Sequence, residues 1–353
     1  MNAASQPGPP CPGDDRPVST GRAAAAARLI LRWGLCAAAV GWLAHTVAWS
    51  DLKRVWMTAD RPLLVLGVLA FGPAPVLIAV RLQWVLAVHE IRLSLWDAIR
   101  ATFAGNFVIN ALPVGTTGGD TVKAFYIARG TPRKHEAVTC IFLDRAIGVL
   151  GLLLLAGTTS LVHWRHPTFA GVGRLVALAV SLLLAGMGVY FSDRVRRFLR
   201  LEQLLARLPL GRHIERVDRA VLAFRGRWWR LTACLLLSVL LQLICIVSIF
   251  LAGRGLGVGE GRVLADAWVY LACTPLCLLA GALPIGGMEL SYVGLFYGVA
   301  GLGTEAAAVS LSLFSRVIQM VWSLPGGLVV LQGGLGEAGA RGLPPDDRPA
   351  PGT

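Results

Sequence analysis

Two glycine-rich breaks interrupt long apolar stretches of this chain, and polar residues gather around both. The first break covers residues 112–120 and the second covers residues 283–289. Lipid tolerates a broken helix backbone only where protein or water surrounds it. Paired breaks of this kind indicate a polar cavity inside a membrane protein.

The first break has the composition of an anion site. Asn106 and Asn110 stand one helical turn apart before it, and a helix expected from about residue 121 would take Asp120 as its N-cap, with Lys123 one turn inside. Free backbone N–H groups at a helix start, beside a cation, can hold a phosphate group. Because Asp120 would repel a phosphate, Lys123 and the backbone are the better contacts. In the alternative, Asp120 only caps the helix and Lys123 snorkels to the surface. The candidate residues of the break itself are Pro113, Gly118, Gly119 and Asp120.

Asp144 and Arg145 lie about two turns inside an apolar segment, at a depth of roughly 10 Å. Ionisable side chains in a membrane span face a partner or a wet cavity, because exposure to lipid costs several kcal/mol. Adjacent residues point about 100° apart around a helix, so we expect each to find its partner elsewhere. Each of the two residues could belong to a structural ion pair or could contact a ligand in the cavity.

Arg316 lies near the middle of the last apolar segment, with three serines around it. Snorkelling is difficult from that depth, so we expect Arg316 to face the bundle interior and to contact a substrate or a gate; the alternative is a fixed salt bridge. Glu289, just after the second break, is a candidate partner for Arg316 or Arg81. Arg81 lies near a segment end, from which we expect it to snorkel.

The composition is that of a polytopic membrane protein. Hydrophobic residues make up 55% of the 353 residues and charged residues 15%, and the mean hydropathy is +0.64. The net charge of +13 does not indicate nucleic acid, because the arginines cluster in tails and between apolar blocks. The seven cysteines form no CxxC pair, and no nucleotide, protease or hydrolase motif is present. We therefore expect no metal, no cofactor and no enzymatic activity.

The apolar pattern predicts an all-α integral membrane protein with six crossings and two re-entrant helical hairpins. The crossings cover residues 29–47, 62–88, 137–163, 175–191, 231–251 and 304–332, and the hairpins cover residues 96–129 and 265–301. Disordered tails, 1–24 and 335–353, flank a membrane domain over 25–334. The arginine-rich loop 192–230 and both termini are then cytoplasmic, as the positive-inside rule requires.

This order of segments is crossing, crossing, hairpin, crossing, repeated with the opposite orientation. Inverted repeats with broken helices near the midplane recur in transporters, because exchanging the conformations of two similar halves gives alternating access. If residues 265–282 cross fully instead, the inversion disappears and the C-terminus moves outside.

Three stretches of the chain resemble the lysylphosphatidylglycerol synthase transmembrane family of flippase-like membrane proteins, over about residues 25–334. The family pattern is Pro, Gly-Gly-Asp, a basic residue and Asp-Arg-x-x-Gly, which occurs here as Pro113, Gly118, Gly119, Asp120, Lys123, Asp144, Arg145 and Gly148. The last span matches at Ser312, Arg316, Gly326 and Gly327. In the second break, Glu289 stands where the family has a glycine. The resemblance implies lipid flipping; family members that move aminoacylated phosphatidylglycerol carry a fused aminoacyl-transferase domain, which this sequence lacks.

The leading hypothesis is a multi-pass protein of the cell membrane that binds or translocates the headgroup of an anionic phospholipid or a polyprenyl lipid. Lys123, Arg145 and Arg316 are its expected anion contacts. The second hypothesis is a non-transporting accessory protein for an envelope-lipid or glycolipid enzyme, docking through the basic loop. The third is an intramembrane lipid-modifying enzyme, for which no acid–base pair or nucleophile stands out.

Overall fold

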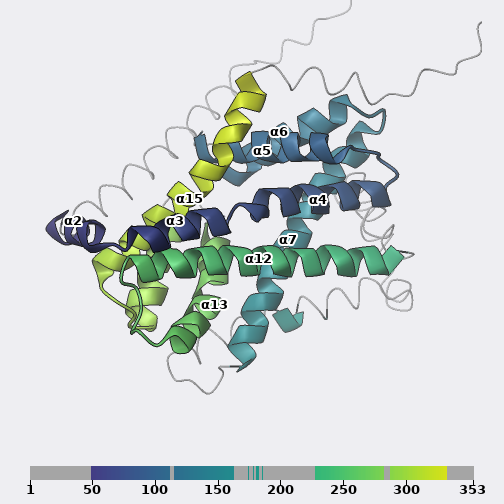
Figure 1. Ribbon diagram of the computed structural model, residues 1–353. Coiled ribbons are helices and arrows are strands. Elements are labelled where there is room, and N and C mark those ends of the chain that lie inside the picture. The colour runs from purple at the N-terminus through teal and green to yellow at the C-terminus, as the bar shows by residue number, and fades with distance from the viewer. Residues whose placement is uncertain are drawn as a thin grey trace, which may run out of the picture.

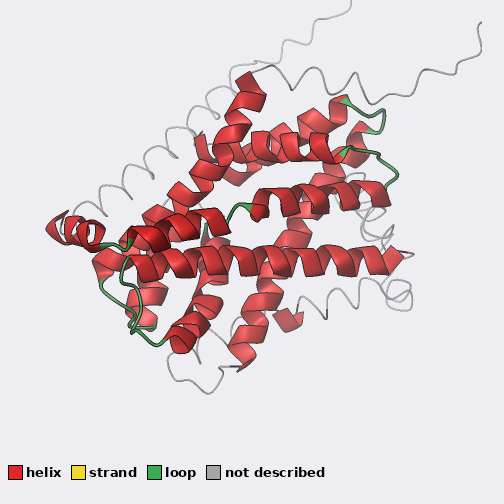
Figure 2. Cartoon of the chain, in the orientation of Figure 1, coloured by secondary structure: helices red, strands yellow, loops and turns green. Residues whose placement is uncertain are grey.

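The computed structural model describes residues 49–111, 115–162, 227–281 and 287–331, together with six single residues between 174 and 185. Every regular element in these ranges is a helix, as Figures 1 and 2 show. The crossing predicted at 29–47, both tails and Pro113 lie outside the described residues, as do most of the crossing at 175–191 and of the loop 192–230. The predicted all-α fold class is confirmed.

Five described helices are long and apolar enough to cross a membrane, by length and composition. They are α3 (Arg61–Ala70) together with α4 (Pro73–Val88), α7 (Lys134–Val162), α12 (Trp228–Gly255), α13 (Val263–Ala280) and α15 (Glu305–Leu331). The first is divided at residues 71–72, because Pro73 and Pro75 lack the backbone donors of a continuous helix. Four of the five coincide with crossings expected from the apolar pattern, and α13 belongs to the second predicted hairpin.

The two glycine-rich breaks each separate helices that pack against one another. α5 (Leu95–Ala111) and α6 (Gly115–Arg129) flank the first break. After the second break, α14 (Gly287–Tyr292) continues as the π-helix η2 (Val293–Val299), and both pack on α13. A short helix, α2 (Trp49–Thr58), precedes α3 and packs on α15.

One side of the molecule, which we call the Arg133 face, joins the end of α4 to the starts of α7 and α12. Arg227, directly before α12, donates from Nη1 to the Val88 carbonyl (2.6 Å). Arg133, between α6 and α7, donates from Nη1 to the His89 carbonyl (3.2 Å). The end of α6 therefore lies at this face, and α5 starts here too, shortly after α4 ends.

The other ends of these helices form a second side, which we call the Asp60 face. The backbone N–H of Asp60 donates to the Gly255 carbonyl (2.8 Å), so the start of α3 lies beside the end of α12. Gly303, just before α15, lies against the backbone of Gly257 and Val258, just after α12. The start of α13 and the end of η2 are consequently at this face.

Each helix pair at a break thus returns to the face from which it starts. The pair α5 and α6 starts and ends at the Arg133 face, whereas α13 and η2 start and end at the Asp60 face. α12 runs antiparallel to α3 and α4 and lies alongside them in Figure 1. Along the described helices, the order of long apolar helix, helix pair and long apolar helix occurs twice in opposite directions. This order is the one expected of an inverted repeat, and the membrane depth of the hairpins stays a prediction.

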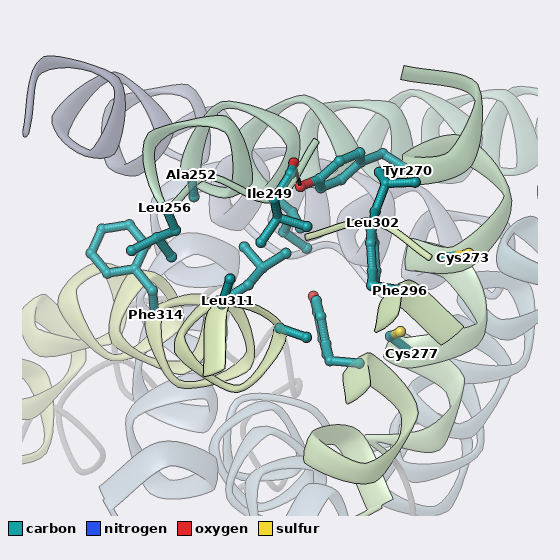
Figure 3. Packing of buried hydrophobic residues seen from close by; sticks show 14 of the residues in the cluster. Ile249, Ala252, Leu256, Tyr270, Cys273, Cys277, Phe296, Leu302, Leu311 and Phe314 are labelled. Carbon is teal, nitrogen blue, oxygen red and sulfur yellow. Dashed lines mark hydrogen bonds between the residues drawn. The ribbon is translucent and has the colours of Figure 1, made fainter. Parts of the chain in front are cut away.

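Two buried apolar clusters hold the helices that carry charged residues. In the larger one, side chains from α12, α13, η2 and α15 meet, with the Tyr270 and Phe296 ring centroids 4.7 Å apart (Figure 3). Cys273 and Cys277 pack in this cluster as small buried residues. The second cluster joins α4, α5, α6 and α7. The clusters fix α14 against α15 and α6 against α7, the two junctions where the candidate residues lie.

Candidate functional site

Among the described residues, the most buried ion pair joins Arg81 of α4 to Asp144 of α7. Arg81 donates from Nε to Oδ1 (2.7 Å) and from Nη2 to Oδ2 (3.0 Å), and its Nη1 donates to Oγ of Ser238 in α12 (2.9 Å). The two side chains are only 7% and 11% exposed. The expectation that Arg81 snorkels is wrong, since a bidentate partner within the bundle holds it more favourably than a distant interface.

Gly148 and Ser238 accommodate the guanidinium group of Arg81. Gly148 lies one turn after Asp144, and a Cβ at that position would come within 3.0 Å of Arg81 Nη1. The Ser238 hydroxyl donates to the Cys234 carbonyl (2.9 Å), so its oxygen is oriented to accept from Arg81. Hydrogen bonds among Arg81, Asp144 and Ser238 connect α4, α7 and α12. We call this group the structural joint.

Arg145, the neighbour of Asp144, pairs with Asp120 of α6 through Nε and Oδ2 at 2.9 Å. The prediction that Asp144 and Arg145 find separate partners is therefore confirmed. The expected role of Asp120 as an N-cap is wrong, because α6 begins at Gly115 and Asp120 lies inside it. The glycines of the break are helical here because Gly119 packs directly against Gly105 and Ile109 of α5, where a side chain would not fit.

Lys123 lies one turn beyond Asp120 and is 7% exposed. Its stem fills the space over Gly105, where an added Cβ would lie 2.6 Å from Lys123 Cε. Lys123 is therefore buried inside the bundle rather than extended to the surface. Within the described part of the chain, Lys123 forms no ion pair and no hydrogen bond. The charged groups that act on it electrostatically are Asp120, Asp144, Arg145 and Arg81.

The second break contributes a corresponding ion pair, between Glu289 of α14 and Nε of Arg316 in α15. The pairing expected from depth alone is confirmed for Arg316 and not for Arg81. The Glu289 side chain is 13% exposed and the Arg316 side chain 46%. The serines near Arg316 donate to carbonyls of their own helix, so the carboxylate is the charged partner that the structure gives to Arg316.

The remaining candidates belong to the α5–α6 junction. Asn110 donates from its side-chain amide to the Asn106 carbonyl (2.9 Å), one turn back on α5. Gly118 and Gly119 lie in the first turns of α6. The structure thus brings Asp120, Lys123 and Arg145 together at this junction. The Glu289–Arg316 pair belongs to the other half of the sequence.

Comparison with known proteins shows the family of this chain. The family model described as the lysylphosphatidylglycerol synthase TM region matches residues 26–333. The chain belongs to this family. The chain is also similar to the UPF0104 membrane protein PH1989 of Pyrococcus horikoshii, with 24% identity over 313 residues, or 80% of this chain and 92% of the relative. The resemblance found in the sequence at about 25–334 is therefore confirmed.

In this lysylphosphatidylglycerol synthase TM-region protein, the Asp-Arg-x-x-Gly pattern now has a physical explanation. Asp144 holds Arg81, Arg145 holds Asp120, and Gly148 leaves room for the Arg81 guanidinium. Arg81 itself was missed as a site residue, because its pairing spans 63 positions of sequence and depends on how α4 packs on α7. The one available signal was Gly148, a small residue on the same helix face as a buried carboxylate.

Proposed function

We propose that this protein binds the anionic headgroup of a membrane lipid, a phospholipid or a polyprenyl phosphate, and carries it across the membrane. Lys123 is the observation that supports this proposal most strongly. A buried ammonium group is costly in a membrane protein unless an anion accompanies it. Since Lys123 has no ion-pair partner among the described residues, we assign that role to the ligand's phosphate.

The charges around Lys123 leave a positive excess. Three cations, Arg81, Lys123 and Arg145, meet two carboxylates, Asp120 and Asp144. Both carboxylates are already bonded to arginines at 2.7–2.9 Å. One added phosphate diester carries a single negative charge, which would balance the group. This charge count supports an anion rather than a cation or a neutral molecule as the ligand.

The proposed orientation places the Arg133 face in the cytoplasm. The arginine-rich sequence 192–226 leads directly into α12, whose start lies at this face. Positive residues are retained on the cytoplasmic side of membrane proteins. The first hairpin then enters the membrane from the cytoplasm and the second enters from the outside, with the two breaks at depth.

The opposite directions of the two halves support movement as well as binding. Inverted halves can exchange conformations, which opens a central site to one side and then to the other. In this proposal Asp144 and Arg81 hold the helices together, whereas Lys123, Arg145 and Arg316 contact the headgroup.

A binding measurement with a matched control tests the proposal. Short-chain phosphatidylglycerol is titrated onto the purified full-length protein in detergent, and binding is followed calorimetrically. We expect Lys123→Gln to weaken binding at least tenfold. Lys134→Gln, at the exposed start of α7, should bind like the wild type. Equal affinities for Lys123→Gln and the wild type would contradict the proposal.

The accessory-protein hypothesis gives a different result in a second assay. If the protein binds the lipid, but liposomes that contain it expose no more labelled headgroup than empty liposomes, it holds lipid without moving it. A role beside a lipid-synthesising enzyme would then replace translocation.

A further inference from the structure

Two ion pairs occupy equivalent places in the two halves of the fold. Asp120 and Glu289 each lie in the helix that follows a break, and their partners are 25 and 27 residues further along the chain. Arg145 and Arg316 are each the twelfth residue of their helix, α7 and α15. α7 starts at the Arg133 face and α15 starts at the Asp60 face. The two ion pairs therefore have the same spacing along the chain, but their helices run in opposite directions.

Helix geometry places both arginines at a similar depth. Twelve residues of α-helix rise about 18 Å, and the hydrocarbon core of a bilayer is about 30 Å thick. Arg145 is counted from the Arg133 face and Arg316 from the Asp60 face, so the helix rise places both close to the bilayer midplane. A phosphate crossing the membrane between these helices would pass the two guanidinium groups in succession.

These two pairs differ from the structural joint in exposure. The Arg145 and Arg316 side chains are 44% and 46% exposed, while their carboxylate partners are 18% and 13% exposed. Arg81 is 7% exposed and uses two nitrogens on one carboxylate. In the exposed pairs the hydrogen bond to the carboxylate runs through Nε. A ligand can reach the exposed part of each of these guanidinium groups, and phosphate binds the same guanidinium fork as a carboxylate.

We propose that Asp120–Arg145 and Glu289–Arg316 are exchangeable latches. The ligand's phosphate replaces Asp120 on Arg145 when it is bound from one side, and it replaces Glu289 on Arg316 when it is bound from the other. This inference rests on the proposed function and adds the exchange by which the anion passes between the halves.

The two latches differ in whether a nearby cation can balance the negative charge of the released carboxylate. Lys123 lies three residues after Asp120 on the same helix face, so its ammonium group, with three N–H donors, can bind the released Asp120 as well as the phosphate. The corresponding position after Glu289 is Tyr292, which is buried and carries no charge. The ligand therefore rests at the Asp120–Arg145 latch and passes the Glu289–Arg316 latch briefly.

Removal of the competing carboxylate tests the exchange. Asp120→Asn and Glu289→Gln each leave an arginine without its own carboxylate, so short-chain phosphatidylglycerol should bind each variant about tenfold more tightly than it binds the wild type. Glu136→Gln, an exposed carboxylate at the start of α7, is the control and should leave the affinity unchanged. If the pairs only stabilise the fold, both site variants lose thermal stability without gaining affinity.

The outcomes separate the latches from the proposed function. If the wild type binds the lipid and neither variant binds it more tightly, the latches are refuted and the proposed function stands. If the folded wild type and both folded variants fail to bind, both proposals fall. Inorganic phosphate, titrated in parallel, identifies the source of the anion. If it binds as tightly as the lipid, with the same gain in the variants, the latches stand and a lipid ligand is refuted.

A second variant covers the case in which Asp120→Asn does not fold. Combining Asp120→Arg with Arg145→Asp keeps an ion pair at the same position, so the fold should persist. With the guanidinium moved to α6, the phosphate loses its contact on α7, and affinity for short-chain phosphatidylglycerol should fall at least tenfold. Wild-type affinity in this folded double variant would overturn the proposal.

Discussion

Asp144→Asn should destabilise the protein strongly. The substitution removes the negative charge and leaves the Arg81 guanidinium, which is 7% exposed, with only Ser238 and a neutral amide as partners. Removal of one member of a buried pair costs about 3–5 kcal/mol because the other charge remains buried. Asp120→Asn should cost less than Asp144→Asn, because its partner Arg145 is 44% exposed and is not left fully buried.

A double-mutant cycle isolates the contribution of the pair itself. Arg81→Gln combined with Asp144→Asn removes both charges, so its cost should be smaller than the sum of the two single changes. We expect a coupling energy of about 2–3 kcal/mol, near the upper end for contacting residues. Reversible unfolding in mixed micelles with rising denaturing detergent, followed by tryptophan fluorescence, measures each free energy.

Two results would refute this reasoning. One is an Asp144→Asn protein within about 1 kcal/mol of the wild type, which would show that the pair does not hold the helices. The other is a stable Asp144→Asn protein that has lost lipid binding. In that case Asp144 would belong with Lys123 and Arg145 as a contact for the ligand.

Three further predictions test other parts of the molecule. Gly148→Ala should cost about 1–3 kcal/mol, because the new Cβ would lie 3.0 Å from Arg81 Nη1; unchanged thermal stability would show that Arg81 has space to move. Arg316→Gln should give a folded, inserted protein that no longer moves lipid, and a variant that is either destabilised or stable and still active would remove Arg316 from the site. A peptide of residues 194–230 should prefer anionic to neutral vesicles at low salt, with about 1 kcal/mol from each cation near the surface; equal binding to both would leave the segment only a role in topology.

The sequence was sufficient to predict features that depend on local pattern. Four of the predicted crossings coincide with helices long and apolar enough to span a membrane, namely α3 with α4, α7, α12 and α15. The angular separation of neighbouring residues on a helix was enough to predict that Asp144 and Arg145 have different partners. Depth along the helix limited the partners of Glu289 to Arg316 or Arg81, and the structure pairs it with Arg316.

Features that depend on packing between distant segments were missed. The glycines before Asp120 favour a turn by intrinsic propensity, but the close packing of Gly119 on Gly105 favours the helix that begins at Gly115. Arg81 lies near a helix end in the sequence, and only the packing of α4 on α7 shows that Asp144 is within its reach. Neither contact leaves a periodic signal in a single sequence.

Lipid movement in reconstituted liposomes is the most direct test of the central claim. The protein is incorporated into vesicles that contain phosphatidylglycerol with a fluorescent label, and a membrane-impermeant quencher added outside reports how much labelled lipid reaches the outer leaflet. With the wild type and with Lys134→Gln, quenching should proceed beyond the outer-leaflet fraction, whereas Lys123→Gln should stop at the level of protein-free vesicles. Wild-type quenching that stops at that same level, or full quenching with Lys123→Gln, would contradict a lipid translocator built around Lys123.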